Sequence, residues 1–315
     1  MLGFLILLGL LANSSAALCD DTAPAPTLAA DPDEPGPSLP PVGRSLFDFL
    51  TTQEVDGRLV QMVPFPFEAL LEQIETEIGA SEPTLKNVLI PLGRSLQRNA
   101  ANPDFFAFPR AVVAADVGPA LRTDQSGILL ADRLYLGFQE KAATIEVISY
   151  NEAAARFEYQ VVRDYREGGD PQVFYADRPT CIACHRNHAP IFSKPLWDET
   201  NANAHVAATL LALQDSFYGI PVARGVDIPN AYDFATDRAN TYAALQRVWQ
   251  EGCADDAGCR ANALLAVLRY KLAGNRHPAP DKEGPHKAFV AALRPQWQAL
   301  WPNGLAVPEG DVPNR

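Results

Sequence analysis

The pentapeptide Cys181-Ile182-Ala183-Cys184-His185 restricts the fold of this chain more than any other feature. It divides the 315 residues into two parts with different apolar patterns. Before it, short runs rich in Val, Ile, Leu and Tyr alternate with turn residues, which predicts antiparallel strands. After it, apolar residues recur at three- and four-residue spacing, which predicts helices. The sequence therefore predicts an α+β fold, in which an antiparallel β-rich middle segment is followed by a mainly helical C-terminal part that carries the pentapeptide.

Individual elements follow from the same patterns. A helix is predicted over 67–78, where Leu70, Leu71, Ile74 and Ile78 recur at helical spacing. Gly168-Gly169-Asp170-Pro171 predicts a turn. The predicted strands are 111–115, 127–138, 144–150, 156–164 and 173–175, and the predicted later helices are 205–217, 239–251, 260–272 and 286–301.

The N-terminus has the composition of an export signal. Residues 2–11 are almost wholly apolar and residues 12–17 are small or polar, which predicts a signal peptide over 1–17. No Lys or Arg precedes the apolar run, and a buried N-terminal helix is the alternative. Residues 18–42 are rich in Pro, Ala and Asp and predict an extended tether. The remainder is predicted to comprise an α+β region at 43–175, a helical region at 176–301 and a disordered tail at 302–315.

The cysteine count agrees with export. Five cysteines are present, and an odd number in an exported protein leaves one to explain. Cys19 directly follows the signal-like run and is a candidate for lipidation, although Leu18 is large for the residue before a lipoprotein cleavage site. Cys253 and Cys259 enclose a polar segment and predict a small disulfide loop in an oxidising compartment. A periplasmic or otherwise exported location is therefore predicted, with a lipid anchor at Cys19 as the one route to a membrane.

The pentapeptide has a specific chemistry. Two thiols separated by two residues can add across the two vinyl groups of a haem and form thioethers. The adjacent His185 then lies under the iron and supplies an imidazole nitrogen as the proximal ligand. The sequence thus predicts one covalent haem c, bound through Cys181, Cys184 and His185.

Three other uses of the pentapeptide are open. A thiol–disulfide oxidoreductase can carry the same residues but needs a βαβ unit around them, whereas here they follow Arg178-Pro179-Thr180. A zinc site would need Cys253 and Cys259 as further ligands, at a spacing unlike that of zinc knuckles. The third alternative is a structural disulfide between Cys181 and Cys184.

The pentapeptide resembles the haem-attachment site of c-type cytochromes. The resemblance covers the motif and its immediate surroundings only. The usual small cytochrome c places a helix just before its motif, whereas here 180 residues and a β-rich stretch precede Cys181. The resemblance implies electron transfer through the haem iron. It implies nothing about the fold, because it is limited to the motif.

The sixth ligand of the iron would decide between functions. The candidates for the distal face are Met62 and His205, because His188 is too close to His185 and because His277 and His286 lie in a Pro- and Gly-rich segment. The apolar stretch 190–197 is a candidate wall of the haem pocket. Arg178, Arg186 and Lys194 are near enough in sequence to pair with the haem propionates.

The favoured function is single-electron transfer by an exported monohaem c-type cytochrome with a redox partner protein. A peroxidase-like haem enzyme and a haem-based gas or redox sensor are the alternatives, and both need an open iron site. The net charge of −12 argues against nucleic acid or an anionic lipid surface as a partner, because both require a basic face.

Overall fold

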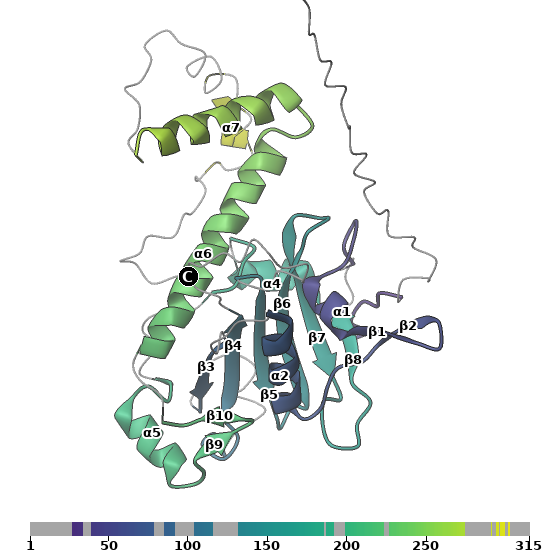
Figure 1. Cartoon of the computed structure of the whole chain (residues 1–315), viewed down its shortest axis with the longest axis vertical. Helices are drawn as coiled ribbons and strands as arrows, with labels where there is room; N and C mark the ends of the chain where they lie inside the picture. The colour runs from purple at the N-terminus through teal and green to yellow at the C-terminus, as the bar shows by residue number, and fades with distance from the viewer. Residues whose placement is uncertain are drawn as a thin grey trace, which may run out of the picture.

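A computed structural model gives the architecture (Figure 1). The statements below concern its described residues, which are 27–33, 39–78, 85–91, 104–115, 132–185, 187–191, 199–223, 227–274, 291, 294–295, 297–299 and 302.

The centre of the fold is a six-stranded antiparallel sheet in which strand order follows chain order. This is the β-rich middle segment that the sequence predicts, and helices follow it, so the α+β class is confirmed. Val, Ile, Leu and Tyr dominate the central strands because both faces of the sheet are covered. The strands are β3 (Leu85–Ile90), β4 (Arg110–Ala115), β5 (Leu134–Gln139), β6 (Thr144–Asn151), β7 (Arg156–Arg163) and β8 (Gln172–Tyr175).

The first face of the sheet, which includes Phe138, Ser149 and Gln160, is covered by the N-terminal elements. Helix α1 (Leu46–Thr51) docks here, since the Phe47 amide donates to the Ser149 hydroxyl at 2.9 Å. Helix α2 (Phe67–Ile78) stacks Phe67 on Phe138 with ring centroids 4.6 Å apart. A small antiparallel hairpin of β1 (Thr52–Val55) and β2 (Arg58–Gln61) connects the two helices.

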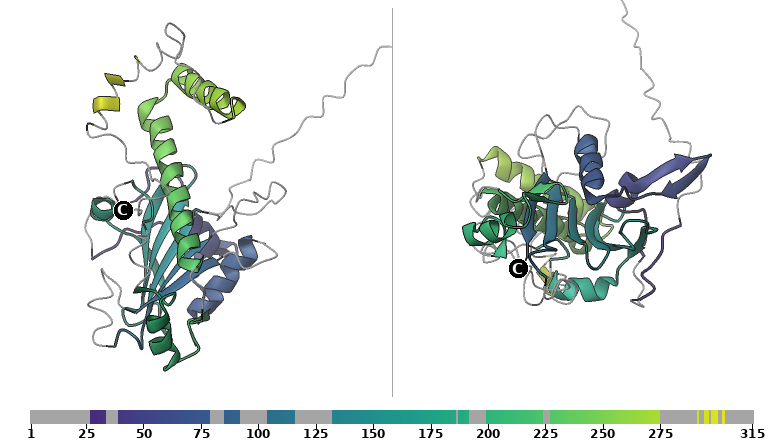
Figure 2. Two further views of the ribbon diagram at one scale, coloured as in Figure 1. Left: turned by 90° about the vertical axis from the view of Figure 1, so that its left-hand side faces the viewer. Right: turned by 90° about the horizontal axis from the view of Figure 1, so that it is seen from below.

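The second face, which includes Tyr135, Ile148 and Tyr159, is covered by elements from later in the chain. Helix α6 (Asp227–Arg247) docks through Tyr135, whose hydroxyl donates to the Ala235 carbonyl at 2.8 Å. The short helix α4 (Arg178–Cys184) contacts β7. Figure 2 shows α2 in blue and α4 in teal on opposite sides of the sheet.

One hydrophobic core unites the predicted α+β and helical regions. It contains residues of α1, α2 and the sheet together with Tyr232, Ala235 and Ala239 of α6. The boundary predicted at 175 and 176 therefore does not separate two cores among the described residues.

Shorter elements complete the C-terminal part. Helix α5 (Ala204–Leu211) is followed by a tight hairpin of β9 (Ser216–Phe217) and β10 (Ile220–Pro221). The π-helix η2 (Val248–Gly252) ends α6, and helix α7 (Ala257–Leu272) follows a sharp corner. Among the described residues, no helix combines the length and the hydropathy needed to cross a membrane.

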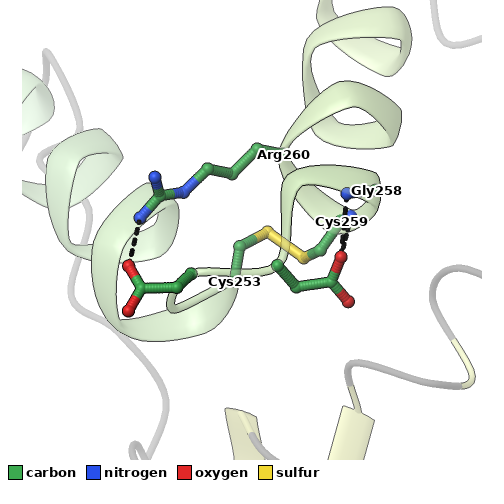
Figure 3. The surroundings of a disulfide bond; sticks show 6 residues. Cys253, Gly258, Cys259 and Arg260 are labelled. Atoms are coloured by element: carbon green, nitrogen blue, oxygen red, sulfur yellow. Dashed lines mark hydrogen bonds and ion pairs between the residues drawn. A yellow bond between two sulfur atoms is a disulfide. The ribbon is translucent and has the colours of Figure 1, made fainter.

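A disulfide closes the corner between η2 and α7, which confirms the predicted pairing of Cys253 with Cys259 (Figure 3). The carboxylate of Asp256 caps the start of α7, accepting from the Gly258 amide at 2.8 Å and the Cys259 amide at 3.0 Å. Trp297 packs against the two sulfur-bearing residues.

Several boundaries differ from the predicted ones. Residues of the predicted tether pair with the sheet edge: Asp31 donates its amide to the Tyr175 carbonyl at 2.9 Å, and its buried carboxylate binds Arg163. The helix predicted over 205–217 ends at Leu211, and its last two predicted residues form strand β9, which turns into β10 through the positive φ of Tyr218 and Gly219. Strand β3 and helices α1 and α4 were not predicted. The described residues include neither the signal-like segment with Cys19 nor the predicted helix 286–301 in full.

Candidate functional site

Helix α4 carries the pentapeptide. Asp177 caps its first turn, since its carboxylate accepts from the Thr180 amide at 3.2 Å, and Pro179 fits the first turn because no helical hydrogen bond is lost there. The Cys181 amide donates to the Asp177 carbonyl at 3.1 Å, and the His185 amide donates to the Cys181 carbonyl at 3.0 Å. These bonds give helical spacing from Asp177 to His185.

Helical spacing brings the three side chains of the motif to one side of α4, since residues three and four apart are neighbours on a helix surface. Cys184 is exposed and Cys181 is half-buried. The two cysteines are not joined in a disulfide, which contradicts the structural-disulfide alternative.

The imidazole of His185 is fixed through one nitrogen. Nδ1 lies 2.9 Å from the Ala189 carbonyl oxygen, and because a carbonyl only accepts, Nδ1 carries the proton. Nε2 of the neutral ring then keeps its lone pair, which is the form that binds a metal. Burial lowers the pKa of His185, so the neutral form is favoured. The ring also packs against Tyr159 of β7, with centroids 5.4 Å apart.

The loop after the motif is tied to α6. The Asn187 side-chain amide donates to the Asn240 side-chain oxygen at 3.1 Å. Asn240 in turn donates to the Pro190 carbonyl at 2.6 Å and is fully buried. These bonds fix the segment that supplies the Ala189 carbonyl, so α6 indirectly sets the orientation of His185.

Two guanidinium groups and two carboxylates lie at the start of α4, where Asp177 is the capping residue. Glu158 is buried, and Arg156 binds its carboxylate through two hydrogen bonds at 2.7 and 3.1 Å. Arg178 lies 3.5 Å from the same carboxylate and donates to the Phe157 carbonyl at 2.5 Å. Burial lowers the pKa of Arg178, and Arg156 lowers it further. Two guanidinium groups thus share one buried carboxylate beside the motif.

Tyr159 is central to this cluster. Its ring contacts His185 on one side, and the Arg178 guanidinium lies 5.5 Å from its centroid. Only 5% of the residue is exposed, and burial raises the pKa of its hydroxyl. In the described part of the chain this hydroxyl has no hydrogen-bond partner. Such an atom is costly to bury and marks a place for a polar ligand atom.

The structure does not bring the two predicted distal candidates to His185. Met62 is 49% exposed and precedes α2, which packs on the first face, so the sheet lies between it and the motif. His205 is exposed in the first turn of α5. The segment before α5 is tied to the far edge strand β3, because Asn201 accepts from the Leu89 amide at 2.9 Å.

Other predicted site residues lie outside the described residues. These are Arg186, Lys194, His277, His286 and most of the apolar stretch 190–197. His188 lies within the described residues. Its amide donates to the His185 carbonyl at 2.7 Å, so His188 belongs to the turn that directly follows the motif.

The zinc alternative is wrong for Cys253 and Cys259, because their sulfur atoms are joined. Among the described residues, no three His, Cys, Asp or Glu side chains gather as ligands for a metal ion. An iron porphyrin needs no such group, since the macrocycle supplies four of the ligands. No family model, no curated protein and no solved structure matches the chain.

Proposed function

We propose that this protein is an exported monohaem c-type cytochrome that transfers single electrons to or from a partner protein. One observation carries the proposal. His185, held by the Ala189 carbonyl through Nδ1, lies on the same helix face as two cysteines that are not in a disulfide. This arrangement combines a proximal ligand with two groups able to form thioethers.

The residues fit the proposed cofactor in three respects. Cys184 is exposed on α4 and Cys181 is half-buried, so a macrocycle can approach this side of the helix. The imidazole is neutral and has a free lone pair on Nε2, because Nδ1 is bonded to a carbonyl. The buried Tyr159 hydroxyl, with no partner in the described residues, can bond to a polar group of a bound ligand.

When bound, the haem supplies an iron that cycles between the ferric and ferrous states. The chain holds the imidazole in one orientation through Ala189 and restricts its rotation through the Tyr159 ring. The hydrogen bond that His185 donates to the Ala189 carbonyl increases the basicity of the ligand, and the buried surroundings limit solvent access.

A haem-based sensor with an open iron site is the second candidate. The positions of Met62 and His205 favour it, since the described structure places neither beside His185. The optical spectrum of the reduced protein with and without carbon monoxide separates the two functions. A spectrum unchanged by carbon monoxide indicates the electron carrier, and a prompt shift indicates the sensor.

Expression of the full chain in a host that matures c-type cytochromes tests the proposal. We expect a coloured protein in the exported fraction, with the mass of one haem added and haem that remains bound after denaturation. The double variant Cys181→Ser/Cys184→Ser should lose the covalent haem. The matched double variant Cys253→Ser/Cys259→Ser should retain it. A colourless wild-type protein without the added mass would contradict the proposal.

A further inference from the structure

Helix α7 exposes a row of leucines. Leu264, Leu268 and Leu272 follow one another at four-residue spacing, and Leu265 lies three residues before Leu268. Because residues three and four apart are neighbours on a helix surface, the four side chains form one apolar face, called here the leucine face. Each of these leucines is between 42% and 87% exposed. A contiguous apolar face in contact with water is typical of an interaction site.

Helix α7 is also the basic part of an acidic protein. It contains Arg260, Arg269 and Lys271 and no Asp or Glu, whereas the chain has a net charge of −12. All 38 acidic residues therefore lie outside α7. Arg269 is exposed and adjoins the leucine face, since Leu265 lies four residues before it and Leu272 three residues after it. In the described part of the chain, Arg269 forms no ion pair.

The charge of α7 restricts what can cover the leucine face. The α7 helix of a second copy would bring like charges together, which opposes association. An anionic lipid surface would attract α7 but repel the remainder of a chain whose net charge is −12. The matching surface is an acidic protein face that also exposes apolar side chains.

Helix α2 offers such a face. It contains four glutamates and no basic residue: Glu68, Glu72, Glu75 and Glu77. Glu68 and Glu72 lie one turn apart, and like charges at this spacing destabilise a helix. None of the four forms an ion pair within the described ranges. Met62 and Phe65, which lie shortly before α2, are 49% and 44% exposed. This acidic face therefore lacks a positive partner and has apolar side chains close by in the sequence.

The two helices of one chain lie apart. Helix α7 lies beyond the end of α6, whereas α2 packs on the first face of the sheet (Figures 1 and 2). We infer that the protein forms a dimer in which the leucine face of α7 in one copy docks on the acidic face of α2 in the other. A two-fold axis produces this contact twice, because each copy supplies one α7 and one α2. The inference is independent of the proposed function, since it involves no residue of α4.

Sedimentation velocity of the full chain over a range of protein concentrations tests the inference. We expect a dimer whose dissociation constant rises about tenfold or more in Leu264→Ser/Leu268→Ser, since both contacts lose apolar area. These leucines are exposed in the single chain, so the circular dichroism spectrum of the variant should match that of the wild type. Phe234→Ser is the matched control and should dimerise as the wild type does. Phe234 is 46% exposed and belongs to α6, which covers the face of the sheet opposite to α2.

Reversed charges test whether α2 is the partner of α7. Arg269→Glu and Glu72→Arg should each weaken the dimer, because each variant alone brings like charges together in both contacts. A mixture of the two variants should restore association, since both contacts of the mixed dimer again join opposite charges. A wild type that stays monomeric at every concentration, or a mixture that associates no better than its components, would overturn the inference. A monomer that binds vesicles of anionic phospholipid through its leucines would also overturn it, because a membrane would then cover the leucine face.

Discussion

At the scale of single residues, His188 links backbone geometry to pH. Its φ of 58° lies in the left-handed region, which His and Asn tolerate better than β-branched residues. Burial, together with the positive charges of Arg247, Arg178 and Arg156, lowers the pKa of His188 from 6.5 to about 4. A proton on this ring is therefore unfavourable in the folded protein.

We predict that His188→Asn flattens the pH dependence of stability on the acid side of neutrality. Below pH 6.5 the unfolded chain binds a proton at His188 that the folded protein does not bind until about pH 4. The contribution of His188 to the free energy of unfolding is thus complete above pH 6.5, and it declines as the pH falls from 6.5 to about 4. Urea unfolding of the wild type and of His188→Asn at pH 7 and pH 4.5 measures how much free energy of unfolding each protein loses between the two pH values. Equal losses in wild type and variant would contradict the prediction.

Residues of the candidate site differ in how well the sequence reveals them. Cys181, Cys184 and His185 form a contiguous motif, so their chemistry is visible without any fold. Tyr159 joins them only because β7 packs against α4 in the folded chain. A Tyr in an alternating strand pattern has no feature that separates a ligand-binding residue from an ordinary core residue.

At the scale of secondary-structure elements, α1 depends on a buried carboxylate. Asp48 is 1% exposed and accepts hydrogen bonds from Gln160 at 2.8 Å, from Gln61 at 2.9 Å and from the Ser45 amide at 3.2 Å. The Tyr175 hydroxyl donates to it as well. This network ties α1 and β2 to the first face at β7 and β8.

We predict that Asp48→Asn destabilises the fold by about 2 kcal/mol, because the new amide group confronts donors that the carboxylate accepted. The exposed ion pair of Asp104 with Lys141 provides a control. Asp104→Asn should lower the free energy of unfolding by no more than about 0.5 kcal/mol. Chemical denaturation of both variants measures the difference, and comparable losses would show that the network contributes little.

The elements themselves were predictable where their apolar pattern was regular. Helix α2 begins and ends where the sequence predicts, because Leu70, Leu71 and Ile74 recur at helical spacing on its buried face. Strand β3 escaped prediction since Lys86 and Asn87 interrupt its apolar run, yet β4 pairs with it throughout. Helix α4 is too short for periodicity to appear, and its local signals were the capping residue Asp177 and Pro179 in the first turn.

At the scale of the whole molecule, the sheet and α6 form one unit and α7 stands apart from it. Helix α6 contributes Tyr232, Ala235 and Ala239 to the main core. In α7, by contrast, four described leucines are at least 42% exposed: Leu264, Leu265, Leu268 and Leu272. The disulfide and Trp297 form a separate small cluster at the corner before α7. We therefore expect local opening of α7 at a free energy below that of global unfolding.

We predict that reducing Cys253–Cys259 accelerates amide hydrogen exchange in α7 and leaves the central strands unchanged. The short loop that this disulfide closes corresponds to about 2 kcal/mol of local stability. Exchange followed by mass spectrometry, with and without reductant, compares peptides from 257–272 with those from β5 to β7. Since α6 shares the main core with the sheet, its turns around Ala235 and Ala239 should remain as protected as β5. Equal acceleration in the sheet would mean that the corner and the core unfold together, so that α7 belongs to the same cooperative unit.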